Sequence, residues 1–122
     1  MESAEIIKTI KEYFTKLEAL KSLHKDQEVL QTAFRENKEL DDFVGFNPTI
    51  LPQKPKEILK EIGNAGYTEE IQKKFQEANE NEKEMVRLYF RFYREATALD
   101  LTNNDNDDIL DFLDDLIQKF NK

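Results

Sequence analysis

The sequence predicts an all-α protein of one domain, folded as a four- or five-helix bundle or as an orthogonal array of helices. Its 122 residues fall within the usual size of a single domain. Glycine and proline number only three each, too few for the turns of a β-sandwich or barrel. Apolar side chains recur at helical spacing along most of the chain, and nine Phe and four Tyr favour a packed core over disorder.

The first two predicted helices cover about residues 3–24 and 27–44. Ser3 is placed to cap the first helix and Asp26 to cap the second, and Gly45 is expected to end the second helix. Because no Gly or Pro precedes residue 45, one long helix with a kink near residue 25 is an open alternative. The apolar positions of the two ranges are Ile6, Ile10, Tyr13, Phe14, Leu17, Leu20, Val29, Leu30, Ala33, Phe34, Leu40, Phe43 and Val44.

Residues 45–54 form the main irregular segment, because their two prolines prevent a helix from continuing. Pro55 suits the first turn of a short helix over about residues 55–62. Gly63 is placed to end this helix, so residues 63–66 are expected to form a turn.

The strongest periodic signal predicts a long helix over about residues 69–99. Thr68 is placed to cap it, and large apolar residues follow at alternating spacings of four and three, interrupted only at Glu82. We expect the centre of the fold to contain side chains from this helix and from the last one, namely Phe75, Met85, Tyr89, Phe92, Phe112 and Leu116.

The last predicted helix covers about residues 107–121, after a connector rich in Asn and Asp. Aspartates lie near its expected N-terminus and lysines near its expected C-terminus, which matches the helix dipole at both ends. Its expected inner face consists of Ile109, Leu110, Phe112, Leu113, Leu116, Ile117 and Phe120.

The residue types argue against catalysis. The chain has one histidine, His24, and no cysteine, and the nearby Ser22 would point to a different side of a helix. A carboxylate di-metal centre needs Glu-x-x-His pairs from two helices, which one histidine does not provide. We therefore expect no enzyme activity, no catalytic residues and no cofactor.

A partial calcium-loop pattern occurs in the connector. Asn103, Asp105, Asp107 and Asp114 match positions 1, 3, 5 and 12 of such a loop. Position 6, where glycine allows the sharp turn, is Asp108. A capped connector that leads into a helix over 109–114 is the better explanation, so we expect no metal site.

The net charge of −8 disfavours direct binding to nucleic acid or anionic lipid and favours a basic protein partner. Aspartates gather near the C-terminus, and a solvated helix face is the alternative explanation for them. The candidate partner-binding residues of this acidic face are Asp105, Asp107, Asp108, Asp111, Asp114 and Asp115.

Two further groups of residues can be explained either by packing within the protein or by binding to a partner. The loop residues Phe46, Ile50 and Leu51 either cover the core or form an apolar docking site. A basic stripe at helical spacing either lies over the core, with its charges directed at acids of neighbouring helices, or binds an acidic partner. This stripe consists of Lys83, Arg87, Arg91 and Arg94.

These features predict a small acidic protein-binding module. The leading hypothesis is an inhibitor, or an immunity or anti-defence protein of phage or bacterial origin, that occludes a basic surface of a partner enzyme. The alternative is an adaptor, assembly factor or secretion chaperone that docks through an apolar helix face, with a homodimer through helix 69–99 left open. Without cysteine, a leader-like start or an apolar run of about 20 residues, a cytoplasmic location away from the membrane is expected.

Overall fold

The computed structural model describes residues 2–45, 48–100 and 107–121. Over these residues the chain forms seven α-helices, which confirms the predicted all-α class. Their bounds are α1 Ser3–Leu23, α2 Gln27–Glu36, α3 Lys38–Phe43, α4 Gln53–Ala65, α5 Glu69–Glu77, α6 Glu80–Asp100 and α7 Asp107–Phe120.

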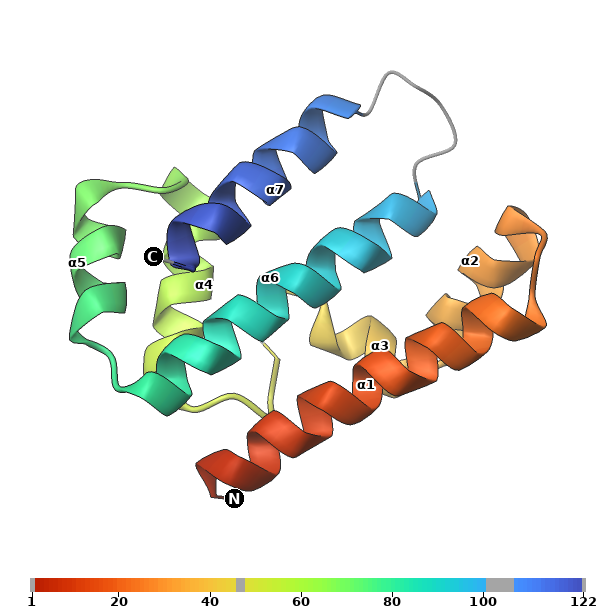
Figure 1. The fold of residues 1–122 in the computed structure, drawn as a ribbon, viewed down its shortest axis with the longest axis horizontal. Coiled ribbons are helices and arrows are strands. Elements are labelled where there is room, and N and C mark those ends of the chain that lie inside the picture. The colour runs from red at the N-terminus through yellow and green to blue at the C-terminus, as the bar shows by residue number, and fades with distance from the viewer. Residues whose placement is uncertain (1, 46–47, 101–106, 122) are drawn as a thin grey trace.

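The two longest helices, α1 and α6, lie side by side and run in the same direction (Figure 1). Helix α7 packs along α6 in the opposite direction, on the side away from α1. Helices α2 and α3 pack against one part of this framework, and α4 and α5 close the other end. Helix α6 therefore contacts α1, α2, α4 and α7 and forms the centre of the fold.

The predicted helix over 27–44 is divided into α2 and α3 at Asn37. The backbone of Asn37 is extended, with φ −82° and ψ 97°, and its Oδ1 accepts a hydrogen bond from the amide of Leu40 at 3.3 Å. Asparagine competes well as a helix cap, so it ends one helix and starts the next without a glycine or proline. Asp26 caps α2 as predicted, accepting from the amides of Glu28 and Val29 at 3.0 and 3.2 Å.

The predicted helix over 69–99 is likewise divided, into α5 and α6. Ala78 is extended, with φ −70° and ψ 154°, and Asn79 then caps α6. Asn79 Oδ1 accepts from the amide of Glu82 at 2.8 Å, while Glu82 Oε1 accepts from the amide of Asn79 at 3.0 Å. This reciprocal pair is a capping box, which explains why Glu82 interrupts the apolar pattern.

Two helix ends also differ from the prediction. The cap position of α1 is Glu2 and makes no side-chain hydrogen bond, so Ser3 is the first helical residue and not the cap. Helix α4 continues through Gly63 to Ala65 and ends at Gly66, whose φ of +76° favours glycine. Thr68 caps the following helix as predicted, accepting from the amide of Ile71 at 3.2 Å.

The core is built on aromatic side chains around Phe92 of α6. Its ring contacts those of Phe14, Phe34 and Phe43 at centroid distances of 5.3, 6.2 and 5.4 Å, which joins α6 to α1, α2 and α3. A second group surrounds Phe120 of α7, where Tyr67, Phe75 and Phe90 pack at 5.5, 4.6 and 5.4 Å. Five of the six side chains expected at the centre are buried; Phe112 is the exception.

Candidate functional site

The outer face of α7 carries a row of exposed carboxylates. Asp108, Asp111 and Asp115 are spaced by three and four residues, which places them on one side of the helix, and all three are exposed. Asp115 pairs with Lys119 at 3.0 Å. Among the residues that the structure describes, Asp108 and Asp111 form no ion pair. We call these three residues the acidic row.

The other predicted members of the acidic face do not join this row. Asp114 lies on another side of α7, half-buried, where it accepts two hydrogen bonds from Arg94 of α6. Asp114 therefore contributes to the attachment of α7 to α6, and its role in binding a partner stays a prediction. Asp105 and the side chain of Asp107 lie outside the described residues.

Within the basic stripe of α6, only Arg94 pairs with an acid of a neighbouring helix in the described part of the chain, as the first of the two interpretations predicted. Arg87 Nε donates to the carbonyl of Phe120 at 2.6 Å, and Arg91 Nη2 donates to Oδ1 of Asn121 at 3.2 Å. The hydrogen bond with Asp114 raises the pKa of Arg94. The three arginines thus attach the C-terminal segment to α6 and leave the opposite side of α7 to the solvent.

Two large apolar side chains lie on the exposed side of α7, next to the acidic row. Phe112 is 53% exposed and Ile109 is 47% exposed. The expectation that Phe112 lies in the core is wrong because Leu113, Leu116 and Phe120 already fill the face of α7 that meets α6. The signal in the sequence is that the apolar arc of this helix is wider than contact with one neighbouring helix requires.

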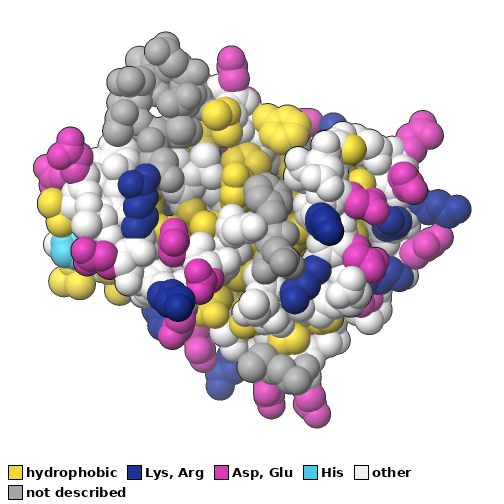
Figure 2. Space-filling view, turned by 180° about the vertical axis from the view of Figure 1, so that it is seen from behind, with side chains coloured by type: hydrophobic (Ala, Val, Ile, Leu, Met, Phe, Trp, Pro, Cys, Tyr) yellow, Lys and Arg dark blue, Asp and Glu magenta, His cyan; other side chains and the backbone are white. Residues whose placement is uncertain are grey.

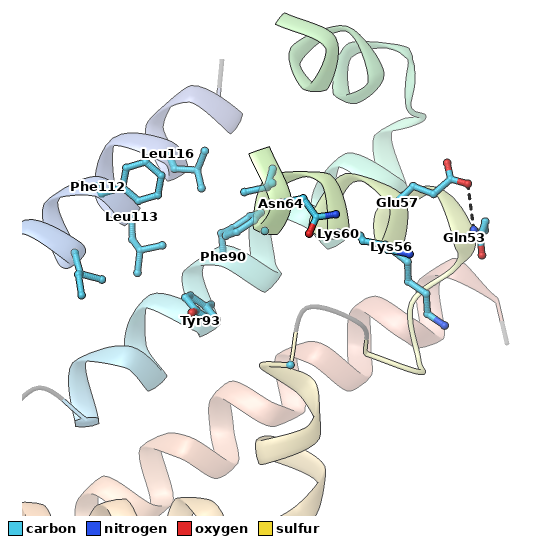
Figure 3. Close-up of a pocket in the computed structure, with 14 residues that line it drawn as sticks. Gln53, Lys56, Glu57, Lys60, Asn64, Phe90, Tyr93, Phe112, Leu113 and Leu116 are labelled. Carbon is cyan, nitrogen blue, oxygen red and sulfur yellow. Dashed lines mark hydrogen bonds between the residues drawn. The ribbon is translucent and has the colours of Figure 1, made fainter. Parts of the chain in front are cut away.

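Phe112 and Ile109 line a groove of about 730 Å³ between α4, α6 and α7. In Figure 3, Phe112, Leu113 and Leu116 lie on α7, Phe90 and Tyr93 of α6 lie next to them, and α4 extends away from them from its Asn64 end to its Gln53 end. Hydrophobic side chains also show through the middle of the surface seen in Figure 2, among basic and acidic ones. The α4 wall is polar; its side chains in the groove include Gln53, Lys56, Glu57, Lys60 and Asn64.

The charges on the two walls of the groove differ. On α4, Lys56 and Lys60 form no ion pair with any residue in the described part of the chain, and Glu57 accepts a hydrogen bond from Gln53 at 3.1 Å. On α7, Phe112 lies between the groove and the acidic row, because it follows Asp108 by four residues and precedes Asp115 by three. The α4 margin therefore carries two lysines beside Glu57, and the α7 side carries the exposed Asp108 and Asp111 beside the Asp115–Lys119 pair.

The candidate residues of the proline-containing loop mostly serve the core. Leu51 is 3% exposed and belongs to the main apolar cluster, and Ile50 is partly buried against the same cluster. The docking interpretation therefore does not hold for Leu51, which is inaccessible to a partner. Phe46 lies outside the described residues.

The structure also describes His24 and part of the calcium-loop pattern. His24 follows the last residue of α1, and no hydrogen bond joins it to Ser22 in the part of the chain that is described. Residues 109–114 are helical as predicted, whereas Asn103 and Asp105 of the calcium pattern lie outside the described residues. Within the described ranges, no three acidic or histidine side chains are arranged to hold a metal ion, and no helix has the length and apolar character of a membrane span.

Comparison with known proteins adds no further site: the chain matches no protein-family model, no curated protein and no solved structure.

Proposed function

We propose that this protein is a small binding module that occludes a basic surface of a partner protein through the outer face of α7. The observation that carries the proposal is the position of Phe112, which is 53% exposed directly beside the acidic row of Asp108, Asp111 and Asp115. Aromatic side chains are enriched at protein-binding surfaces, and two of the three neighbouring carboxylates, those of Asp108 and Asp111, form no ion pair within the described ranges.

The two kinds of side chain have separate roles in such an interface. Phe112 and Ile109 supply the apolar area whose removal from water holds the complex together. The acidic row, supported by the net charge of −8, accelerates the approach of a basic partner and rejects acidic ones. An inhibitor, or an immunity or anti-defence protein, acting on a basic enzyme needs this combination of fast association and slow release.

Other parts of the proposal follow from composition. An acidic surface of this kind would compete with nucleic acid for the same basic groove and would not bind nucleic acid itself. The proposed activity requires no catalytic group, metal or cofactor. We place it in the cytoplasm, since a chain without cysteine requires no oxidising compartment to fold.

The test first captures the partner with the wild-type chain. It then measures the rate at which the partner associates with each of two matched variants. Asp108→Asn/Asp111→Asn removes two exposed carboxylates of the acidic row, and Glu12→Gln/Glu77→Gln removes two exposed carboxylates on α1 and α5. The first variant should associate roughly tenfold more slowly and with a weaker salt dependence than the second. Equal association rates for the two variants would refute the proposal.

A second candidate is an adaptor, assembly factor or secretion chaperone that docks through an apolar helix face. The exposed Phe112 and Ile109 favour it, whereas Ile71, Phe75 and Phe92 of α5 and α6 are buried in the core and are not part of its docking face. Its affinity would depend on Phe112 but hardly on salt, and binding would have a negative heat-capacity change. A salt-independent association rate would therefore favour this candidate over an inhibitor of a basic enzyme.

A further inference from the structure

We infer that the groove between α4 and α7 binds an amphipathic α-helix of the partner protein, with a basic edge along α7 and an acidic edge along α4. The inference rests on the proposed function in that it takes a protein as the ligand. It goes further by assigning the groove, the type of bound segment and the charges on its two edges.

The dimensions of the groove suit a helix. The α4 positions that line it run from Gln53 to Asn64 at spacings of three and four, which marks one continuous helix face about 16 Å long. The opposite wall, from Ile109 to Leu116, is about 10 Å long. Phe90 and Tyr93 lie in the groove between these two helices, so its lining suits a bound helix that presents one apolar face.

The charges on the two margins specify the rest of the ligand. Lys56 and Lys60 are one turn apart on α4 and form no ion pair among the described residues. They therefore favour acidic side chains on the bound helix. On α7, Asp108 lies one turn before Phe112, is exposed and forms no ion pair within the described ranges, so it favours a basic side chain on the bound helix, whereas Asp115 is already paired with Lys119. Turning a bound helix end for end would exchange its edges, so this pattern also determines the direction in which the helix lies.

Other occupants are less well matched. A second copy of the chain also carries a net charge of −8, and the repulsion between two copies opposes association at ordinary salt. A small apolar ligand is usually enclosed over most of its surface, whereas Phe112 leaves one wall open at 53% exposure. A protein helix is the occupant that needs no enclosure, because its outer face remains in water.

The inference can be tested with designed helical peptides of about four turns that share one Leu and Phe face. One peptide has Lys along one edge and Glu along the other, and the second has Lys along both edges. Binding of each to the full chain is measured by fluorescence anisotropy. The variant Lys56→Glu/Lys60→Glu reverses the α4 margin, and Lys8→Glu/Lys11→Glu makes the same change in net charge at two exposed positions of α1.

Relative to the α1 variant, the α4 variant should bind the mixed-edge peptide about tenfold more weakly and the all-basic peptide more tightly. The opposite responses of the two peptides exclude a simple effect of net charge. The inference is overturned if both variants respond alike, or if neither peptide binds the wild-type chain at millimolar concentration. Displacement of the mixed-edge peptide by an equimolar amount of sodium dodecanoate would also overturn it, in favour of a small amphiphile.

This experiment can fail independently of the proposed function. The lysine variants leave the acidic row intact, and the aspartate variants leave the α4 margin intact. If the lysine variants respond alike while Asp108→Asn/Asp111→Asn still slows association with the captured partner, only the assignment of the groove is lost.

Discussion

Arg94 of α6 holds Asp114 of α7 through two hydrogen bonds, from Nε to Oδ1 at 2.9 Å and from Nη2 to Oδ2 at 3.4 Å. Asp111 lies three residues earlier on the same helix, is exposed, and has no ion pair in the described part of the chain. Two aspartates from one acidic cluster thus have different roles. One attaches α7 to the core, and the other remains accessible to a partner.

Replacing these two aspartates should separate stability from binding. Asp114→Asn should lower the free energy of unfolding by up to about 1 kcal/mol, because the lost ion pair is only partly shielded from water. Asp111→Asn should change it by less than about 0.5 kcal/mol and should instead slow association with a basic partner. Urea denaturation and stopped-flow binding measure the two effects; a reversed pattern would show that Asp114 is the binding residue.

The exposed Phe112 and the buried Phe92 should respond differently to the same substitution. Phe92→Ala leaves a cavity where several aromatic rings meet and should cost about 3 to 5 kcal/mol. Phe112→Ala should change the free energy of unfolding by less than about 1 kcal/mol while weakening partner binding at least tenfold. Leu23→Ala, at a position 74% exposed on α1, is the control and should affect neither quantity. Binding that survives Phe112→Ala unchanged would count against α7 as the interface.

The capping box at the start of α6 should contribute measurably to stability. Asn79→Ala removes the acceptor for the amide of Glu82 and should cost about 0.5 to 2 kcal/mol. Asn81→Ala makes the same substitution at an exposed position inside the helix, where alanine is the better helix former, and should be neutral or stabilising. Thermal melts of the two variants provide the comparison. Equal melting temperatures would mean that the break between α5 and α6 does not depend on this cap.

Stability should fall in alkaline solution above the ordinary tyrosine pKa of 10.0. Burial, with a smaller effect of the Glu39 carboxylate, raises the pKa of Tyr13, so the folded chain keeps a proton that the unfolded chain releases. Burial lowers the pKa of Lys21, but the hydrogen bonds and negative charges of Glu95 and Glu18 together outweigh burial and raise the pKa overall. Both contributions are fully present below the unfolded-state pKa values and are lost as the pH rises through the folded-state values.

Tyr13→Phe isolates one of these two contributions. It keeps the ring that packs on Phe43 at 5.2 Å but removes the titrating hydroxyl. Between about pH 8 and pH 11, the urea midpoint of this variant should fall less steeply than that of the wild type. Identical slopes would show that Tyr13 does not contribute to the alkaline loss of stability.

The sequence pattern predicts the class of the fold and most of its core, because helical periodicity reports directly which side chains face inward. It does not predict the breaks at Asn37 and Asn79. At both positions a side-chain cap competes with continuation of the helix, and the outcome depends on tertiary packing that periodicity does not contain.

The candidate site is only partly predictable for a related reason. The run of aspartates indicates an acidic surface, but only the packing of α7 on α6 shows which of them pair with arginines. The groove depends on where α4 lies against α7, two elements far apart in the sequence. The exposure of Phe112 likewise follows from that packing and not from its residue type.

The most direct test of the protein-binding face is amide hydrogen exchange of the full chain with and without the captured partner. Binding at α7 and the adjacent groove should slow exchange at residues 108–116 and 56–64 and leave α1 and α2 unchanged. The rival apolar surface is at the corner between α1 and α2, where Leu23 is 74% exposed and Val29 is 48% exposed. Protection confined to that corner would contradict the assignment of α7 as the binding face.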